Sequence, residues 1–411
     1  MEEQTIVLEP KTYTRAQRWL LLGALAIGLT WNFMRWRLGH MVHSTLDFYG
    51  IFWAVYLVVF YVFNWEALKR NYLCWTLGLA AALLCASSLW QPLAELSALC
   101  AVGLPLLLMT HAVFATNDIP VRREGQAVFL VLQGFFVKPF TAIPDAFRAF
   151  GSLFKRKEQG AAKRVLLGLA IGLPLALVVL LLLSSADKVM GHLLGTWFVD
   201  IRFGEIFWHI VNIVAATVLF YSFLFNSRWG KRTELTVSDK PKAAPVTANV
   251  VLVLLLLVYA VFAYVQFRYF FSGQLPADMT YSEYARSGFW ELIVVMLINI
   301  SAYTAINALC KEGGALRVLQ CLLMAATALL LTSAIMRLIM YIGAYGLTIM
   351  RILPLWLMIW LAAMVVLAVV RLFRPGTPML RISALSLVWW FVVLNMPNWA
   401  RIMTMVNARY F

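Results

Sequence analysis

Long apolar runs constrain this chain more than any other feature, because they recur from close to one end to close to the other. Each run approaches 20 residues, about the length of α-helix that crosses the hydrocarbon core of a bilayer. The expected spans are residues 18–35, 47–64, 72–90, 93–112, 164–186, 204–226, 248–271, 287–308, 316–343, 352–372 and 381–395. The sequence therefore predicts an all-α fold, a polytopic membrane bundle of about eleven transmembrane helices.

Composition supports the same class of protein. Hydrophobic residues make up 63% of the 411 residues and charged residues only 13%, whereas soluble domains usually carry about 25% charged residues. A chain with so few charges has too little polar surface to face water on all sides. The net charge of +15 suits basic loops that stay in the cytoplasm, so we expect no nucleic-acid partner.

Basic residues orient the bundle, since loops rich in Lys and Arg remain on the cytoplasmic side. They concentrate before the first span, in the stretch 113–163 and in the polar linker 227–247. An even number of expected spans separates each of these stretches from the next, so all of them can lie on one side of the membrane. We therefore expect the amino terminus in the cytoplasm and the carboxyl terminus outside. Arg35 and Arg37 are the exception, because they fall in an outer loop.

The stretch 113–163 also holds an expected interfacial amphipathic helix. Its segment 144–157, PDAFRAFGSLFKRK, mixes apolar and basic residues after a Pro-Asp helix start, a pattern typical of helices that lie in the headgroup layer. Its basic residues would face anionic lipid. The adjacent segment 126–143 is short and broken for a span, although an additional crossing there remains an alternative.

The linker 227–247 also suggests the domain organisation. Its Pro, Lys and Ser content is typical of a cytoplasmic loop. It ends an amino-terminal membrane region, residues 1–247, and precedes a carboxyl-terminal membrane region, residues 248–411, which we expect to form a unit of its own.

Polar residues cluster where the eighth and ninth spans reach the predicted outer face. Glu291 lies inside the eighth span, where an acid costs roughly 2–3 kcal/mol and normally has a partner. Arg337, Tyr341 and Tyr345 recur every four residues and share one helix face. We predict that Glu291 pairs with Arg337 beneath a group of tyrosines. The candidate ligand-binding residues are Tyr281, Tyr284, Arg286, Glu291, Arg337, Tyr341, Tyr345 and Arg351.

Plainer interpretations of these residues remain open. Tyrosines and arginines near helix ends are ordinary interfacial anchors. Asn299, Tyr303 and Asn307, at four-residue spacing, would either line a path across the membrane or hydrogen-bond to neighbouring helices. The terminal segment 395–411 would either fold over the outer site as a polar lid or be a frayed tail.

Motifs for metal, cofactor and common enzyme chemistry are absent from the sequence. The five cysteines form no CxxC pair, and the pairs His40 with His43 and Glu205 with His209 offer fewer ligands than a zinc site needs. There is no GxxxxGK[ST], GxSxG or HExxH motif. We expect no metal and no cofactor, and whether the protein is an enzyme stays undecided.

Two stretches carry a resemblance to a known family. Residues 280–289 read TYSEYARSGF, and Arg337 is followed by Tyr341, by AYGLT at 344–348 and by Arg351. They resemble a family of uncharacterised bacterial multi-pass inner-membrane proteins, catalogued as a domain of unknown function. The resemblance is good over about 275–352 and weak before 248. It implies a helical fold in a bacterial inner membrane and supplies no activity.

These features favour one function and leave three others open. We expect an integral inner-membrane protein that binds or senses a lipid-linked or small anionic ligand at its outer face. The alternatives are a transporter or channel, a membrane enzyme acting on lipid-linked substrates, and a scaffold or signalling partner. Membrane lipids are the expected partners, with anionic lipid at the basic cytoplasmic loops, and a protein partner remains open.

Overall fold

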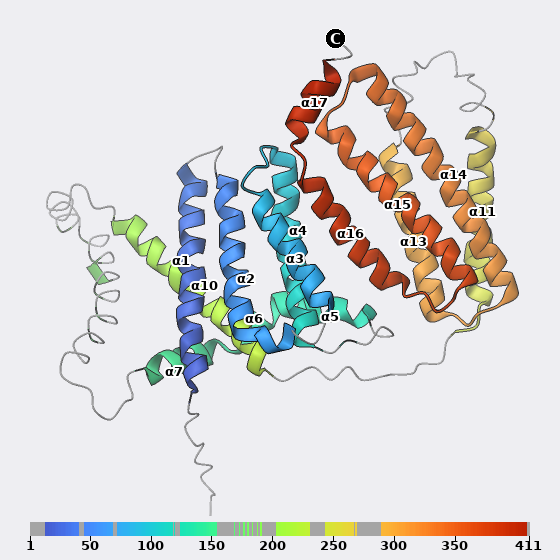
Figure 1. Ribbon diagram of the computed structural model, residues 1–411. Helices are drawn as coiled ribbons and strands as arrows, with labels where there is room; N and C mark the ends of the chain where they lie inside the picture. The colour runs from blue at the N-terminus through green and yellow to red at the C-terminus, as the bar shows by residue number, and fades with distance from the viewer. Residues whose placement is uncertain are drawn as a thin grey trace, which may run out of the picture. The chain divides into compact units, whose positions relative to one another are not determined.

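The apolar runs fold as α-helices in the parts of the chain that the structure describes. The structure is a computed structural model, and it describes residues 13–40, 45–68, 72–117, 119, 124–153, 203–230, 243–266, 268 and 289–408, with isolated positions between 168 and 190. No β-strand occurs among these residues, where a single isolated bridge joins Ala243 to Cys310. The all-α prediction is confirmed (Figure 1).

The chain forms two compact units. The first comprises Met1–Trp90, Cys100–Ile119 and Gln126–Glu234, and the second Gln91–Leu99, Pro120–Gly125 and Leu235–Phe411. The first unit contains α1 (Arg15–His40), α2 (Thr45–Leu68), α3 (Tyr72–Ser87), most of α4 (Ala94–Thr116) and of α5 (Glu124–Phe136), α6 (Lys138–Thr141), α7 (Ile143–Ser152) and α10 (Phe203–Trp229). The second contains α11 (Val246–Val265), α13 (Phe289–Leu309), α14 (Gly314–Tyr345), α15 (Ile349–Phe373), α16 (Met379–Asn395) and α17 (Trp399–Asn407).

Close helix contacts in the first unit depend on small and polar residues. A Cβ added at Gly28 of α1 would lie 2.8 Å from the carbonyl oxygen of Ile213 in α10, so only glycine lets these two backbones approach so closely.

In α4, Pro105 has no N–H for the carbonyl oxygen of Ala101. The hydroxyl of Tyr49 donates to that oxygen at 2.7 Å and replaces the missing helical hydrogen bond.

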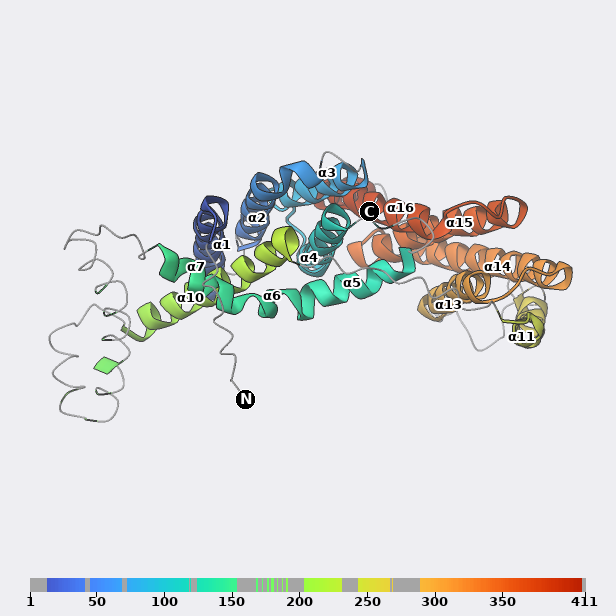
Figure 2. The same cartoon turned by 90° about the horizontal axis from the view of Figure 1, so that it is seen from below.

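The segment α5–α7 lies across the axes of α1 and α2 (Figure 2). Its longest helix, α5, has 13 residues and rises about 20 Å, which is too short for a bilayer core. In α7, Ala146 and Ala149 are buried while Phe147 and Phe150 are exposed. This amphipathic helix fits the interfacial prediction, and the break after α5 argues against an additional crossing at 126–143.

Polar contacts dock this segment on the rest of the first unit. The Nδ2 of Asn226 in α10 donates to the Lys138 carbonyl at 2.7 Å, and the Oγ of Ser222 accepts the N–H of Ala142 at 2.9 Å. The hydroxyl of Tyr13, ahead of α1, donates to Oδ1 of Asp145 in α7 at 2.6 Å. Burial, together with this hydrogen bond, raises the pKa of Tyr13 to about 12. The segment is therefore hydrogen-bonded both to α10 and to the residues that precede α1.

In the second unit, α14 packs against α11, α13 and α15. One apolar cluster contains Leu252 of α11, Leu323 of α14 and Ala368 of α15, all fully buried. A second cluster, further along α14, contains Leu338 and Met358. The helix α14 is therefore the central element of this unit.

The predicted number of spans is not confirmed. Within the described residues seven helices are long and apolar enough to cross a bilayer, namely α2, α4, α10, α11, α13, α14 and α15. The number is eight if α16 and α17, which meet at a 66° bend, form one broken span. The predicted span 18–35 is helical in α1, but Asn32 and Arg35 lower its hydropathy; α3 has only 16 residues. The predicted span 164–186 lies almost entirely outside the described residues.

Candidate functional site

The turn between α14 and α15 is the structural centre of the candidate site. The first helix ends at Tyr345 and the second begins at Ile349. Gly346 follows with φ +76°, a left-handed conformation that side chains other than glycine's rarely adopt. Glycine is needed here for a second reason, because an added Cβ would lie 2.9 Å from Oδ1 of Asn407. The sequence AYGLT thus encodes a tight, sterically restricted reversal.

Arg351 binds the end of α14 from the first turn of α15. Its Nη1 donates to the Tyr345 carbonyl at 2.8 Å and to the Gly346 carbonyl. A cation suits this position because the last carbonyls of a helix lack partners within the helix and carry its negative dipole end. The guanidinium carbon lies 4.3 Å from the ring centroid of Tyr341 and 5.7 Å from that of Tyr345. Both distances are within the range of cation–π attraction.

The two tyrosines form a small aromatic wall. The ring centroids of Tyr341 and Tyr345 are 5.1 Å apart, and the rings meet edge to face. Tyr345 is 52% exposed, while Tyr341 and Arg351 are half-buried. The structure therefore brings together three of the eight candidate residues, as their four-residue spacing and the short loop predict.

The cluster retains the capacity to bind an anion. Among the described residues, no protein acceptor receives a hydrogen bond from Nε or Nη2 of Arg351. These two nitrogens form one of the guanidinium edges that bind a carboxylate or phosphate bidentately. The guanidinium edge would bind the anionic group of a ligand, and the partly exposed tyrosine rings beside it would contact an apolar or aromatic part of the same ligand.

A residue that sequence reasoning missed holds the turn in place. Asn407, in the last turn of α17, donates from Nδ2 to the Leu347 carbonyl at 2.9 Å and accepts the Leu347 N–H at 2.7 Å. The helix α17 begins at a local cap, in which Asn398 Oδ1 accepts the N–H of Arg401 at 3.1 Å. The terminal segment is therefore folded against the turn as far as residue 408. No local signal identifies Asn407, because its partner is 60 residues away in the sequence.

The remaining predicted site residues are distributed differently. Arg337 is buried in α14, with 7% of its surface exposed, whereas Glu291 is exposed in the first turn of α13. The hydrogen bonds and ion pairs of the described residues do not join Glu291 to Arg337. An acid in the first turn of a helix is favoured by the helix dipole. Tyr281, Tyr284 and Arg286 lie outside the described residues.

The stripe on α13 connects helices. Asn299 is fully buried, accepts the Tyr259 hydroxyl of α11 at 2.6 Å and donates to Oγ1 of Thr327 in α14 at 3.0 Å. Tyr303, also fully buried, donates to the Ala368 carbonyl of α15 at 2.9 Å. Asn307 donates to the carbonyl of Tyr303 within its own helix. Asn299 and Tyr303 therefore cross-link the bundle, as one of the two sequence interpretations holds.

Metal chemistry has no candidate centre in the described part of the chain, where no group of three or more His, Cys, Asp or Glu could hold an ion. All five cysteines have free thiols.

The fold and this site define an integral membrane protein with many helices and polar clusters at helix ends. The chain belongs to the family described as domain of unknown function (DUF4153), which matches residues 78–410. This match begins in α3, so it includes most of the first unit as well as the second. No curated protein and no solved structure matches the chain.

Proposed function

We propose that the protein binds or senses a small anionic or lipid-linked ligand at the α14–α15 turn. One observation carries the proposal: Arg351 lies against the Tyr341 ring, and no acceptor among the described residues occupies its Nε–Nη2 edge. A guanidinium preorganised on an aromatic face binds an anion with less loss of side-chain freedom than a free arginine.

The location of the ligand follows from the charge distribution. We infer from the positive-inside rule that the α14–α15 turn lies at the outer face of a bacterial inner membrane, with the amino terminus in the cytoplasm. Tyr281, Tyr284, Arg286, Glu291 and Arg337 remain proposed contributors. A transporter or channel is less well supported, because Asn299 and Tyr303 are fully buried and bonded to neighbouring helices.

The partners that we propose are lipids. The exposed aromatic residues of α6 and α7, including Phe140 and Phe147, suit an apolar contact in the headgroup layer. Arg15 and Arg18 line a hollow beside Leu153, just beyond α7, where they would attract anionic headgroups.

Native mass spectrometry of the full chain, released from membranes with its lipids, tests the proposed function. Wild type would retain a specific bound species, and Arg351→Gln would lose it. The control is Arg374→Gln, which removes an exposed arginine at the opposite end of α15 and should leave the species bound. Identical spectra for wild type and Arg351→Gln would contradict the proposal.

A further inference from the structure

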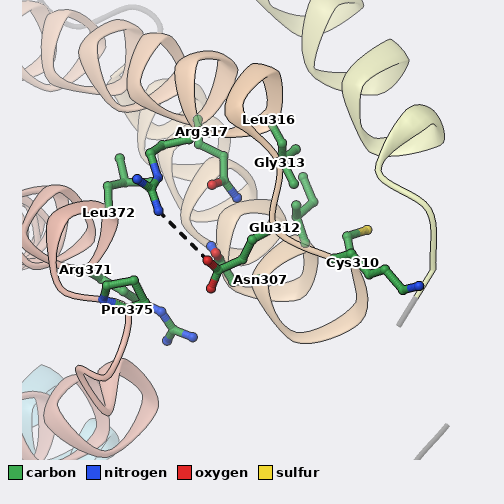
Figure 3. Close-up of a pocket in the computed structure, with 12 residues that line it drawn as sticks. Asn307, Cys310, Glu312, Gly313, Leu316, Arg317, Arg371, Leu372 and Pro375 are labelled. Atoms are coloured by element: carbon green, nitrogen blue, oxygen red, sulfur yellow. Dashed lines mark ion pairs between the residues drawn. The ribbon is translucent and has the colours of Figure 1, made fainter. Parts of the chain in front are cut away.

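A second polar cluster lies at the other end of α14. A cavity of about 120 Å³ is bounded by the α13–α14 turn, the start of α14 and the end of α15. Figure 3 shows Arg317, Glu312 and Arg371 around this cavity. The proposed function does not use it, because the Arg351 turn lies at the opposite end of α14.

A buried amide points to a ligand. Gln320 lines the cavity and is only 3% exposed. Its Nε2 is buried, and no acceptor among the described residues receives a hydrogen bond from it. Buried donors are nearly always bonded in native proteins, since an unpaired one loses the hydrogen bonds that water would supply. An acceptor oxygen in the cavity would satisfy this donor.

The start of α14 offers further donors to the same cavity. Gly313, the N-cap residue, has an extended backbone, and no side chain caps the helix there. The first N–H groups of a helix lack partners within the helix and carry its positive dipole end, so they favour an anion. Gly313 and Leu316, at this end of the helix, line the cavity.

The charged side chains around the cavity are mainly basic. Lys311, Arg317 and Arg371 are positive and Glu312 is negative, so the four together carry a net charge of +2. Arg317 and Glu312 lie 3.9 Å apart, but both are more than half exposed, so their attraction is weak. Arg317 therefore stays available to a bound anion, while the negative charge of Glu312 repels that anion.

Backbone hydrogen bonds restrain the turn that bounds the cavity. The N–H of Ala243 donates to the Leu309 carbonyl at 2.8 Å, and the N–H of Lys311 donates back to the Ala243 carbonyl at 3.0 Å. These two bonds tie the chain ahead of α11 to the α13–α14 turn. They therefore restrain the turn that leads into the start of α14.

We propose that this cavity binds a phosphate group. The buried amide of Gln320, the uncapped start of α14 and the surplus of two positive charges all select an anion with several acceptor oxygens. The phosphate is either free inorganic phosphate or the headgroup of an anionic phospholipid such as phosphatidic acid. This inference is independent of the ligand proposed for Arg351.

The first experiment measures binding of radiolabelled inorganic phosphate to the purified full chain in a neutral detergent. The second measures retention of phosphatidic acid by native mass spectrometry from phosphatidylcholine nanodiscs containing it. Variants are Gln320→Met, which removes the amide at similar volume, and Arg317→Gln. Each should weaken binding about tenfold or more, because each removes a charge-assisted or buried hydrogen bond. The control, Arg374→Gln, removes an exposed charge nearby that does not line the cavity.

The outcomes separate the two sources of phosphate. Binding of inorganic phosphate that both variants weaken supports a free-phosphate site, and retention of phosphatidic acid alone supports a headgroup site. Glu312→Gln should tighten binding of the same probe several-fold, which a general loss of folding cannot imitate. The proposal is overturned if neither probe binds wild type, or if Gln320→Met and Arg317→Gln bind as tightly as Arg374→Gln.

Discussion

The side-chain amide of Asn407 pairs with the backbone of Leu347 as a neighbouring strand would, donating at 2.9 Å and accepting at 2.7 Å. Through this pair α17 restrains the turn that presents Arg351, so the last helix has a structural role at the candidate site.

Replacing Asn407 by Ala should loosen the α14–α15 turn. The two lost hydrogen bonds are half-buried, so we expect about 1–2 kcal/mol less stability. Hydrogen exchange should accelerate at the Leu347 amide, which mass spectrometry of the 346–350 region reports. Thr404→Ala is the matched control, because Thr404 bonds only within α17. Equal exchange in the two variants would mean that Asn407 does not hold the turn.

Replacing Gly346 by Ala should cost about 1–2 kcal/mol, because the φ of +76° is unfavourable for any residue with a Cβ. In an Asn407→Ala background the cost should fall, since the Cβ then no longer meets Oδ1 of Asn407. Gly343→Ala is the control. It lies within α14 with nothing near its added Cβ, and should stabilise the helix by up to about 1 kcal/mol. Thermal unfolding in detergent measures all four variants.

The contact between Tyr49 and the Ala101 carbonyl should depend on Pro105. Tyr49→Phe should cost about 1 kcal/mol, because it leaves the carbonyl without the donor that proline cannot supply. With Pro105→Ala, an N–H becomes available within α4, and the same Tyr49→Phe change should cost less. Equal costs in the two backgrounds, measured by denaturant unfolding, would show that the tyrosine acts through packing alone.

The docking of α7 should weaken in strong base. The pKa of Tyr13 is raised from its usual 10.0 to about 12, so its protonated form is favoured in the folded protein. Its contribution to stability is fully present below pH 10 and is lost as the pH rises through 12. Unfolding measured at several pH values between 9 and 12 should show this loss in wild type. Tyr13→Phe should lack it, and a parallel decline in both proteins would contradict the assignment.

The sequence predicts well which residues share one face of a helix, and poorly which neighbour that face contacts. The four-residue spacing of Tyr341 and Tyr345 places their rings 5.1 Å apart, as expected. The pairing of Glu291 with Arg337 is expected because an acid inside a span normally has a partner, yet Glu291 is exposed and Arg337 buried. Depth follows from residue counting, whereas the direction in which a helix faces depends on packing partners that the sequence does not name.

Counting apolar residues has a related weakness. It treats α1 as a span despite Asn32 and Arg35, and α3 as a span although its helix has 16 residues. It also overlooks Gln320, a polar residue near the start of the long helix α14, whose importance depends on the cavity around it. Polar groups that meet only through tertiary structure, such as the side-chain amide of Asn407 and the backbone of Leu347, leave no local pattern to detect.

The length of α14 has a consequence for how its two polar ends respond to the membrane. Its 32 residues rise about 48 Å, whereas the hydrocarbon core of a bilayer is about 30 Å thick. Such hydrophobic mismatch is relieved by tilt or by helix ends that protrude into the headgroup layers. Bilayer thickness would then set how deeply the Arg351 turn and the Gln320 cavity lie relative to the lipid phosphates. Membrane composition would therefore affect the access of ligands to both sites.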